Sequence, residues 1–284
     1  MPRTVRAALD EAALAIGRVD ARVLCAHLLA VDRAWIAANP MHVLTESQDA
    51  RLDALVAQRA MGHPVAYLLG RREFYGRDFE VGPDVLIPRP ETETLVEAAL
   101  DLLRRPRAGG DPPAILDLGT GSGAIAVTLA CERPDARIVA TDASAAALAL
   151  ARANARRNDC EGRIEFIRGS WYDAVPGKRF DLVVANPPYV AAGDAHLGRG
   201  DLRFEPPGAL TDGSVDGLAS IRAIVAGAPA HLVPGGALLF EHGYDQAEAA
   251  AALLVRAGFT RLVSRPDIAG IPRVAGGIIV SCPE

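Results

Sequence analysis

From residue 114 onward, short apolar runs alternate with longer amphipathic segments, and this alternation limits the possible folds more than any other feature. The spacing predicts strands near 114–118, 137–141, 163–168, 181–185, 236–241, 259–264 and 276–281, and helices near 122–131, 143–157, 215–230 and 244–257. Such alternation builds a mostly parallel sheet with helices on both faces. Ligands of these sheets lie at the carboxyl ends of the strands. We therefore expect the functional residues in the loops that follow those ends.

The earlier part of the chain has a helical pattern. "DARVLCAHLLAVD" spaces apolar residues by three and four, with Asp20 in an N-cap position, and Thr45 caps "TESQDARLDALVAQRAMG". "REFYGRDFEV" (72–81) predicts a hairpin that turns at Gly76, and "PRAGGDPP" (106–113) predicts a linker. The expected regions are a helical domain, a hairpin and linker region, and the sheet domain, at 1–80, 81–113 and 114–284.

Composition argues against several classes of protein. A net charge of −5 and a pI of about 5.7 do not suit a chain that wraps nucleic acid through many phosphate contacts. There is no uncharged apolar run of about 18 residues, and acidic residues interrupt the N-terminal stretch, so neither a membrane span nor a signal peptide is predicted. The expected location is the cytoplasm. The four cysteines lie far apart, without zinc-binding spacing, and no metal site is expected.

The first predicted strand of the sheet leads into a glycine-rich loop in "ILDLGTGSGAIAVTLA" (115–130). Glycines allow positive φ and let a ligand approach bare backbone, while the following helix offers unpaired N–H groups. Asp142 ends the second strand, where a carboxylate can accept hydrogen bonds from the two hydroxyls of a ribose. This pattern fits both a nicotinamide dinucleotide and S-adenosylmethionine. Trp171, after the third strand, is either a platform for adenine or a core residue.

The segment "VVANPPYV" (183–190) distinguishes the two cofactors. Proline cannot serve a central strand, so the strand should end at Ala185 and a stiff loop should follow. Hydride transfer needs a nearby proton donor or acceptor, which Asn-Pro-Pro-Tyr supplies poorly. Methyl transfer to an amide or amino nitrogen instead needs acceptors that orient the nitrogen, and the Asn186 side-chain oxygen and Pro187 carbonyl fit that role. Tyr189 offers a flat face for a planar group.

These loops carry a resemblance to a known family. "DLGTGSG" followed by "NPPY" resembles class I S-adenosylmethionine-dependent methyltransferases that act on a planar nitrogen. Four further segments, "FYGRDFEVGPDVLIPRPETE", "TDASAAALALARANARRN", "FEPPGALTDGSVDGL" and "LFEHGYDQ", are similar in that order to the bacterial protein-(glutamine-N5) methyltransferases of peptide chain release factors. The resemblance covers nearly the whole chain.

The resemblance implies an α/β fold: a seven-stranded, mostly parallel Rossmann-like methyltransferase sheet with a small helical N-terminal domain that helps to dock the release factor. It implies methyl transfer from S-adenosylmethionine to the glutamine of a Gly-Gly-Gln motif. The implied cofactor contacts are Gly119, Thr120, Gly121, Ser122, Gly123, Asp142, Trp171 and Asn186, and the implied glutamine contacts are Asn186, Pro187, Pro188 and Tyr189. Pro207 and Gly208 depart from the expected residues, which leaves the geometry of 205–218 open.

Three other functions compete with this interpretation. A related enzyme class methylates a ribosomal-protein glutamine with the same loop, but "IPRPETE" and the short helical start favour release factors. An exocyclic amine of a nucleic-acid base poses the same chemical problem, yet a flipped base usually requires a basic face or a recognition domain. A non-catalytic binding module needs neither loop. We expect a release factor as partner, with no stable nucleic-acid binding and no membrane.

Overall fold

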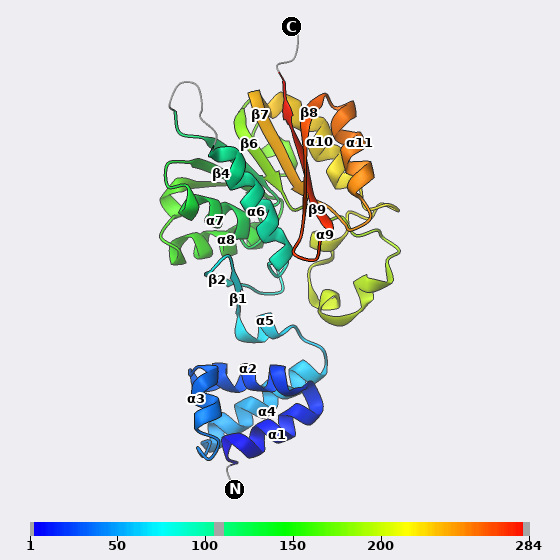
Figure 1. Ribbon diagram of the computed structural model, residues 1–284. Coiled ribbons are helices and arrows are strands. Elements are labelled where there is room, and N and C mark those ends of the chain that lie inside the picture. Colours follow the sequence, from blue (N-terminus) through cyan, green and yellow to red (C-terminus); the bar gives the residue numbers. More distant parts are fainter. Residues whose placement is uncertain (1–2, 105–110, 281–284) are drawn as a thin grey trace. The chain divides into compact units, whose positions relative to one another are not determined.

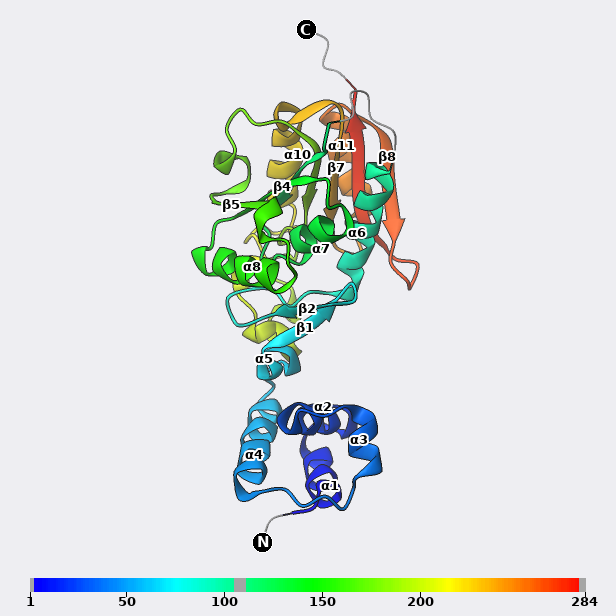
Figure 2. The same ribbon diagram turned by 90° about the vertical axis from the view of Figure 1, so that its left-hand side faces the viewer.

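The computed structural model describes residues 3–104 and 111–280. The chain divides into two compact units, one formed by 1–71 with 199–204 and the other by 72–198 with 205–284. Figures 1 and 2 show the elements of both units in two views. Most of the predicted linker at 106–113 lies outside the described residues. Within the described ranges, no helix has the length and apolar character needed to cross a membrane.

The smaller unit is helical. Its helices are α1 (Val5–Ile16), α2 (Arg18–Leu29), α3 (Arg33–Ala38), α4 (Glu46–Ala60) and α5 (Val65–Leu69). Their apolar faces meet in a core that includes Val5, Leu24 and Leu52. Thr45 caps α4 as predicted, in a capping box with Gln48.

The predicted N-cap at Asp20 is wrong. The cap residue of α2 is Gly17, and Asp20 lies in the first turn of the helix. Its carboxylate accepts a 2.7 Å hydrogen bond from Arg59 Nε of α4. The local sequence predicts that the Asp20 side chain caps its own helix. In the structure this side chain instead binds Arg59, a residue of another helix that lies 39 positions further along the chain.

The larger unit begins with the predicted hairpin, which consists of β1 (Arg71–Phe74) and β2 (Arg77–Glu80). Gly76 lies between these strands with φ of 72°. The remaining strands are β3 (Ala114–Leu118), β4 (Arg137–Asp142), β5 (Ile164–Arg168), β6 (Phe180–Ala185), β7 (Leu232–Glu241), β8 (Phe259–Pro266) and β9 (Pro272–Ile279). The longer helices are α6 (Pro90–Leu103), α7 (Ala124–Glu132), α8 (Ala145–Arg157), α10 (Ala219–His231) and α11 (Ala247–Arg256), and α9 (Pro207–Leu210) is one short turn.

The seven strands from β3 to β9 form one sheet in the order β5-β4-β3-β6-β7-β9-β8. Pairs from β5 to β7 are parallel, whereas β9 is antiparallel to both of its neighbours. The predicted seven-stranded, mostly parallel sheet is therefore confirmed.

Both faces of the sheet are buried because strand residues alternate between two cores. On β6, Leu182 and Val184 join the core shared with α6 and α7, and Val183 and Ala185 join the core shared with α10 and α11. Figures 1 and 2 show these two helix pairs on opposite sides of the sheet. This burial leaves the carboxyl edge of the strands as the place where polar loops gather.

Candidate active site

The glycine loop and the Asn-Pro-Pro-Tyr loop begin side by side at the carboxyl edge. Leu118, the last residue of β3, pairs with Ala185, the last residue of β6. The chain fills the sheet from β3 to β5 in one direction and then continues on the other side of β3 with β6 and β7. Reversals of this kind create a crevice between the loops of the two central strands. The two motifs that the sequence singled out therefore face a common space.

Positive φ angles shape the glycine loop. Gly119, Gly121 and Gly123 have φ of 71°, 55° and 82°. A Cβ on Gly119 would lie 3.4 Å from Trp171 Cζ3, whereas one on Gly123 would lie 3.1 Å from Ala151 Cβ of α8. Gly119 thus faces the side of the loop where Trp171 lies, and Gly123 allows α7 to start close to α8.

Asp142 connects the end of β4 to this loop. Its Oδ2 accepts a 2.9 Å hydrogen bond from Gly121 N, and its Oδ1 accepts a 2.8 Å hydrogen bond from Ser144 N. A carboxylate oxygen has two lone pairs, so each oxygen can still accept a bond from a ligand hydroxyl. Asp142 therefore fixes the backbone of both neighbouring loops and keeps capacity for a ligand.

Two fully buried side chains hold the glycine loop from behind. Asn154 of α8 donates to the carbonyl oxygens of Ser122, at 2.8 Å, and of Glu80, at 2.9 Å, and accepts from Glu80 N at 2.7 Å. Asp117 accepts a 2.6 Å hydrogen bond from the Thr120 hydroxyl. Burial raises the pKa of Asp117 to about 7, and the nearby charge of Asp142 adds to this effect. Side chains from β3 and α8 thus support the loop.

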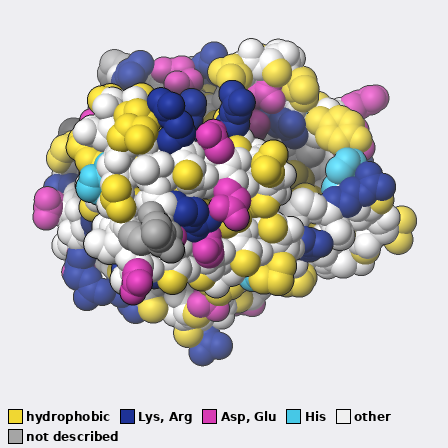
Figure 3. All heavy atoms as spheres, turned by 90° about the horizontal axis from the view of Figure 1, so that it is seen from below, with side chains coloured by type: hydrophobic (Ala, Val, Ile, Leu, Met, Phe, Trp, Pro, Cys, Tyr) yellow, Lys and Arg dark blue, Asp and Glu magenta, His cyan; other side chains and the backbone are white. Residues whose placement is uncertain are grey.

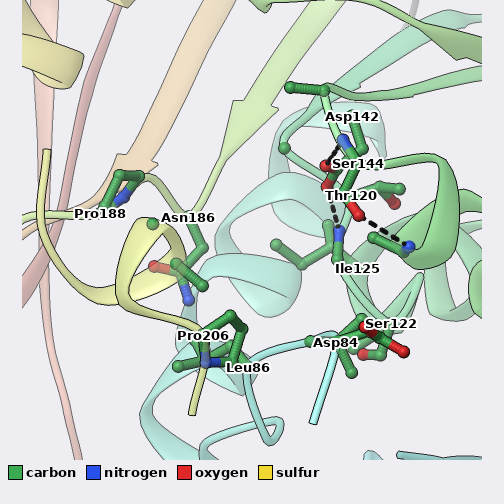
Figure 4. Close-up of a pocket in the computed structure, with 18 of the residues that line it drawn as sticks. Asp84, Leu86, Thr120, Ser122, Ile125, Asp142, Ser144, Asn186, Pro188 and Pro206 are labelled. Carbon is green, nitrogen blue, oxygen red and sulfur yellow. Dashed lines mark hydrogen bonds between the residues drawn. The ribbon is translucent and has the colours of Figure 1, made fainter. Parts of the chain in front are cut away.

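These loops enclose a pocket of about 480 Å³, drawn in Figure 4. Its walls contain seven of the predicted cofactor residues, namely Gly119, Thr120, Gly121, Ser122, Asp142, Trp171 and Asn186. Gly123 is not among the lining residues. Of the predicted glutamine-binding loop, Asn186 and Pro188 line the pocket and Pro187 and Tyr189 do not. In Figure 4, Asp142, Thr120 and Ser144 lie on one side, and Asn186 and Pro188 on the other.

Two segments that sequence reasoning did not place in the site complete the pocket. Residues Pro83, Asp84, Val85, Leu86, Pro88 and Arg89 form one wall segment, and Pro206, Gly208 and Ala209 form the other. Glu205 joins the two segments, because its buried carboxylate pairs with Arg89 and accepts a 3.0 Å hydrogen bond from Ile87 N. The sequence segments "VGPDVLIPRPETE" and "FEPPGAL" belong to the family resemblance, and this was the only sign that they have a role. Nothing in either segment indicates that the two are in contact.

Trp171 has an unusual backbone for a tryptophan. It starts the short 3₁₀ helix Trp171–Ala174 with φ of 43°, in the left-handed region that bulky residues rarely adopt. Strain of this kind persists only where the surrounding structure fixes the conformation, and it is common at ligand-binding sites. Trp171 lines the pocket and also packs against the core below α10. The packing of Trp171 against this core confirms the core interpretation for part of the side chain, and the role as a platform for adenine stays a prediction.

Comparisons with known proteins match both units of the chain. Residues 3–70 match the PrmC N-terminal domain, and residues 100–199 match the Methyltransferase small domain. Solved structures support the fold: a methyltransferase from Pyrococcus furiosus has a TM-score of 0.52 at 17% identity over 82% of this chain and 100% of its own. A 16S rRNA N2 G1207 methyltransferase from T. thermophilus has a TM-score of 0.53 at 22% identity, over 74% of this chain and 49% of its own.

Curated relatives are much more similar to the chain. A release factor glutamine methyltransferase from Bordetella pertussis is 52% identical over 263 residues, which is 92% of this chain and 95% of the relative. One from Burkholderia pseudomallei is 54% identical over 91% of both chains, and one from Xylella fastidiosa is 49% identical over 98% of both. The chain therefore belongs to the release factor glutamine methyltransferase family.

Proposed function

We propose that this chain transfers a methyl group from S-adenosylmethionine to the side-chain amide nitrogen of a glutamine in a peptide chain release factor. The relatives named for this activity match more than nine tenths of the chain. The observation that carries the chemistry is that Asn186 and the glycine loop line one pocket. A methyl donor bound by the glycine loop would thus lie within the same cavity as an amide bound by Asn186. The glutamine of a Gly-Gly-Gln motif is the proposed target, and the cytoplasm is the proposed location.

The pocket fits the proposed methyl donor. Its volume of about 480 Å³ lies in the range of ordinary cofactor sites. Asp142 offers carboxylate oxygens to the ribose hydroxyls, and Trp171 offers an aromatic face to the adenine. The bare backbone at Gly119 leaves room for close approach of the ligand. We assign Gly119, Gly121, Asp142 and Trp171 to this cofactor, and Gly123 to the packing of α7 against α8.

Orientation is the main task of the protein in this reaction. When bound, S-adenosylmethionine supplies an electrophilic methyl group on a sulfonium. The lone pair of an amide nitrogen is delocalised, so the nitrogen must be held in a reactive orientation. In our proposal the Asn186 side-chain oxygen and the Pro187 carbonyl accept the two amide hydrogens. These acceptors also favour the positive charge that develops on the attacking nitrogen. Tyr189 as a flat face for the glutamine stays a prediction.

A methyl-transfer assay with three substrates tests the proposal. The purified chain is incubated with radiolabelled S-adenosylmethionine and, separately, with a release factor, ribosomal protein and DNA or RNA. We expect label only on the release factor, and a release factor with its Gly-Gly-Gln glutamine changed to alanine should stay unlabelled. On the face drawn in Figure 3, basic and acidic side chains are intermixed, unlike the one-sided basic surface typical of nucleic-acid binders. Label on nucleic acid or ribosomal protein instead would contradict the proposal.

Asp142→Ala should weaken S-adenosylmethionine binding about 10- to 100-fold, which corresponds to roughly one or two charge-assisted hydrogen bonds. The variant loses the ribose acceptor and also the bonds that hold Gly121 N and Ser144 N. Isothermal titration calorimetry measures this Kd, with the exposed Asp173→Ala as a matched control that should bind like the wild type. Tight binding of NADH without binding of S-adenosylmethionine would overturn the cofactor assignment.

We further propose that the helical unit docks the release factor and takes no part in methyl transfer. A chain that starts at Arg72 should bind S-adenosylmethionine with nearly normal affinity but methylate the release factor poorly. The cut belongs before the hairpin, not at residue 80, because Phe74 and Phe79 are buried in the core of the larger unit. Wild-type kcat/KM for full-length release factor in the shortened chain would exclude a docking role.

A further inference from the structure

A chain of hydrogen bonds leads from Asn186 to a buried carboxylate. Asn186 Nδ2 donates to Thr92 Oγ1 at 3.1 Å, and the Thr92 hydroxyl donates to Glu241 Oε2 at 2.6 Å. The Tyr189 hydroxyl donates to Glu241 Oε1 at 2.8 Å. Thr92 is the third residue of α6 and Glu241 is the last residue of β7, so three separate elements meet here. Thr92 and Glu241 are 4% and 1% exposed.

We propose that Thr92, Glu241 and Tyr189 are positioning residues that determine which way the Asn186 amide faces. This inference rests on the proposed function, in which the Asn186 oxygen accepts a hydrogen of the substrate amide. An asparagine side chain has an acceptor end and a donor end of nearly the same shape. We call the two acceptors for the substrate amide, the Asn186 oxygen and the Pro187 carbonyl, the clamp. With the donor end of Asn186 toward the substrate nitrogen, N–H groups would face each other and the clamp would not form. The orientation of Asn186 is therefore as important as its presence.

The direction of the bonds follows from counting protons. An ionised carboxylate only accepts hydrogen bonds, so the Thr92 hydroxyl must donate its hydrogen bond to Glu241. The Thr92 oxygen is left with lone pairs alone toward Asn186, and only the NH₂ end of the asparagine can satisfy them. The Asn186 oxygen is then the amide atom that remains for a ligand in the pocket that Asn186 lines. A buried carboxylate thus sets the orientation of the clamp through one hydroxyl.

Tyr189 supports the carboxylate at its other oxygen. Burial keeps the pKa of Tyr189 well above its ordinary value, and the charge of Glu241 raises it further, so the phenol retains the proton that it donates. Gln246 Nε2 donates to the Tyr189 carbonyl oxygen at 3.0 Å and fixes the backbone of the same residue. Both ends of Tyr189 are therefore held, which keeps the hydroxyl in place beside Glu241.

The hydrogen bonds from Tyr189 to Glu241, from Thr92 to Glu241 and from Asn186 to Thr92 form what we call the relay. The charge state of Glu241 makes this relay depend on pH. Burial raises the pKa of Glu241, while hydrogen bonds from Thr92 and Tyr189 and the charge of Arg273 lower it, and the charge of Glu91 raises it. Protonated Glu241 would no longer require Thr92 to donate toward it. Because the net shift is upward, the relay is intact above this raised pKa and is lost as pH falls through it. Removing the Tyr189 donor should move that transition to higher pH.

Substitutions at Thr92 test the relay. Thr92→Val keeps the shape and removes the hydroxyl, and we expect kcat to fall about 10- to 100-fold, as for a misplaced reacting group. The Kd for S-adenosylmethionine should stay within about two-fold of the wild type, as is typical of a loss confined to the transition state. Thr92→Ser should restore most of kcat. Thr128→Val is the matched control, because Thr128 is also buried but its hydroxyl has no partner among the described residues.

Two further measurements do not depend on how well Thr92→Val folds. The acid limb of the kcat–pH profile should move to higher pH in Tyr189→Phe. The second measurement uses cofactor-free protein labelled with ¹⁵N-asparagine, in which Asn186→Ala identifies the Asn186 NH₂ signal. Hydrogen exchange at this NH₂ group should be slow in the wild type and in Thr92→Ser. It should be faster in Thr92→Val.

The outcomes separate the relay from the proposed function. Wild-type kcat in Thr92→Val, Thr92→Ser no better than Thr92→Val, or an unmoved acid limb in Tyr189→Phe would overturn the relay and leave the proposed function standing. A wild-type chain that methylates no release factor would overturn the proposed function, and the relay with it.

Discussion

Asn186→Ala should lower the turnover number about 100- to 1,000-fold while the Kd for S-adenosylmethionine changes only a few-fold. The expected loss corresponds to roughly 2.7–4 kcal/mol, by analogy with the removal of one oxyanion-hole donor. The effect should be confined mainly to kcat because the hydrogen bond from the substrate amide strengthens as charge develops on the nitrogen. Single-turnover methylation of release factor and calorimetry with S-adenosylmethionine measure the two quantities separately.

Asn186→Asp is an informative companion to this variant. It keeps an acceptor of the same size but adds a charge and removes the NH₂ donor. The Thr92 hydroxyl has one proton, and two carboxylates would then compete for it, since Glu241 already accepts it at 2.6 Å. We expect this variant to be impaired as well, and Asn158→Ala, outside the pocket-lining residues, to be normal. Normal turnover with abolished cofactor binding in Asn186→Ala would show that Asn186 serves the cofactor alone.

The second large effect is expected at Arg89. The Glu205 side chain is fully buried and pairs with Arg89, which is 29% exposed. Arg89→Ala removes the charged partner and leaves a buried carboxylate with the Ile87 N–H as its remaining donor among the described residues. Loss of one partner of a buried ion pair costs about 3–5 kcal/mol, and we expect the lower end because Arg89 is partly solvated. The corresponding decrease in Tm is roughly 6–12 °C.

Urea and thermal unfolding measure this loss, and two further variants show its origin. Arg89→Ala combined with Glu205→Gln removes the buried charge and should recover part of the lost stability. Lys178→Ala breaks an exposed ion pair with Glu165, at 44% and 57% exposure, and should cost about 1 kcal/mol or less. If Arg89→Ala is no worse than Lys178→Ala, the pair contributes little, and the two pocket walls must be held together by other contacts.

Features that depend on local pattern could be predicted from the sequence. The alternation of apolar runs places the strands, and the glycines and prolines identify the loops at their ends. The strand order places β3 next to β6, so the loops that follow these two strands lie side by side. Few other strand orders are possible, because crossover connections between parallel strands are nearly always right-handed. The sequence therefore predicts that the glycine loop, Asp142 and Asn186 belong to one site, and residues of all three line the same pocket.

Features that depend on distant partners could not be predicted. Thr92 and Glu241 are 149 residues apart, and Arg89 and Glu205 are 116 residues apart. Neither pair has a local signature, since a threonine in the first turn of a helix and a glutamate at a strand end are ordinary residues. Asp20 shows the same limit, because its contact with Arg59 replaces the cap that the local pattern indicated. Buried polar pairs of this kind are determined by the fold as a whole.

The long separation between Thr92 and Glu241 also has a consequence for the nascent chain. At about 5–20 residues per second, the ribosome needs on the order of ten seconds to add the 149 residues between them. During that time Thr92 has no carboxylate to accept its proton, and the Asn186 amide, once made, can adopt either orientation. The orientation of the Asn186 side chain is thus fixed only when β7 joins the sheet, late in synthesis. A chain that stops short of Glu241 would have the glycine loop but no defined orientation of Asn186 beside it.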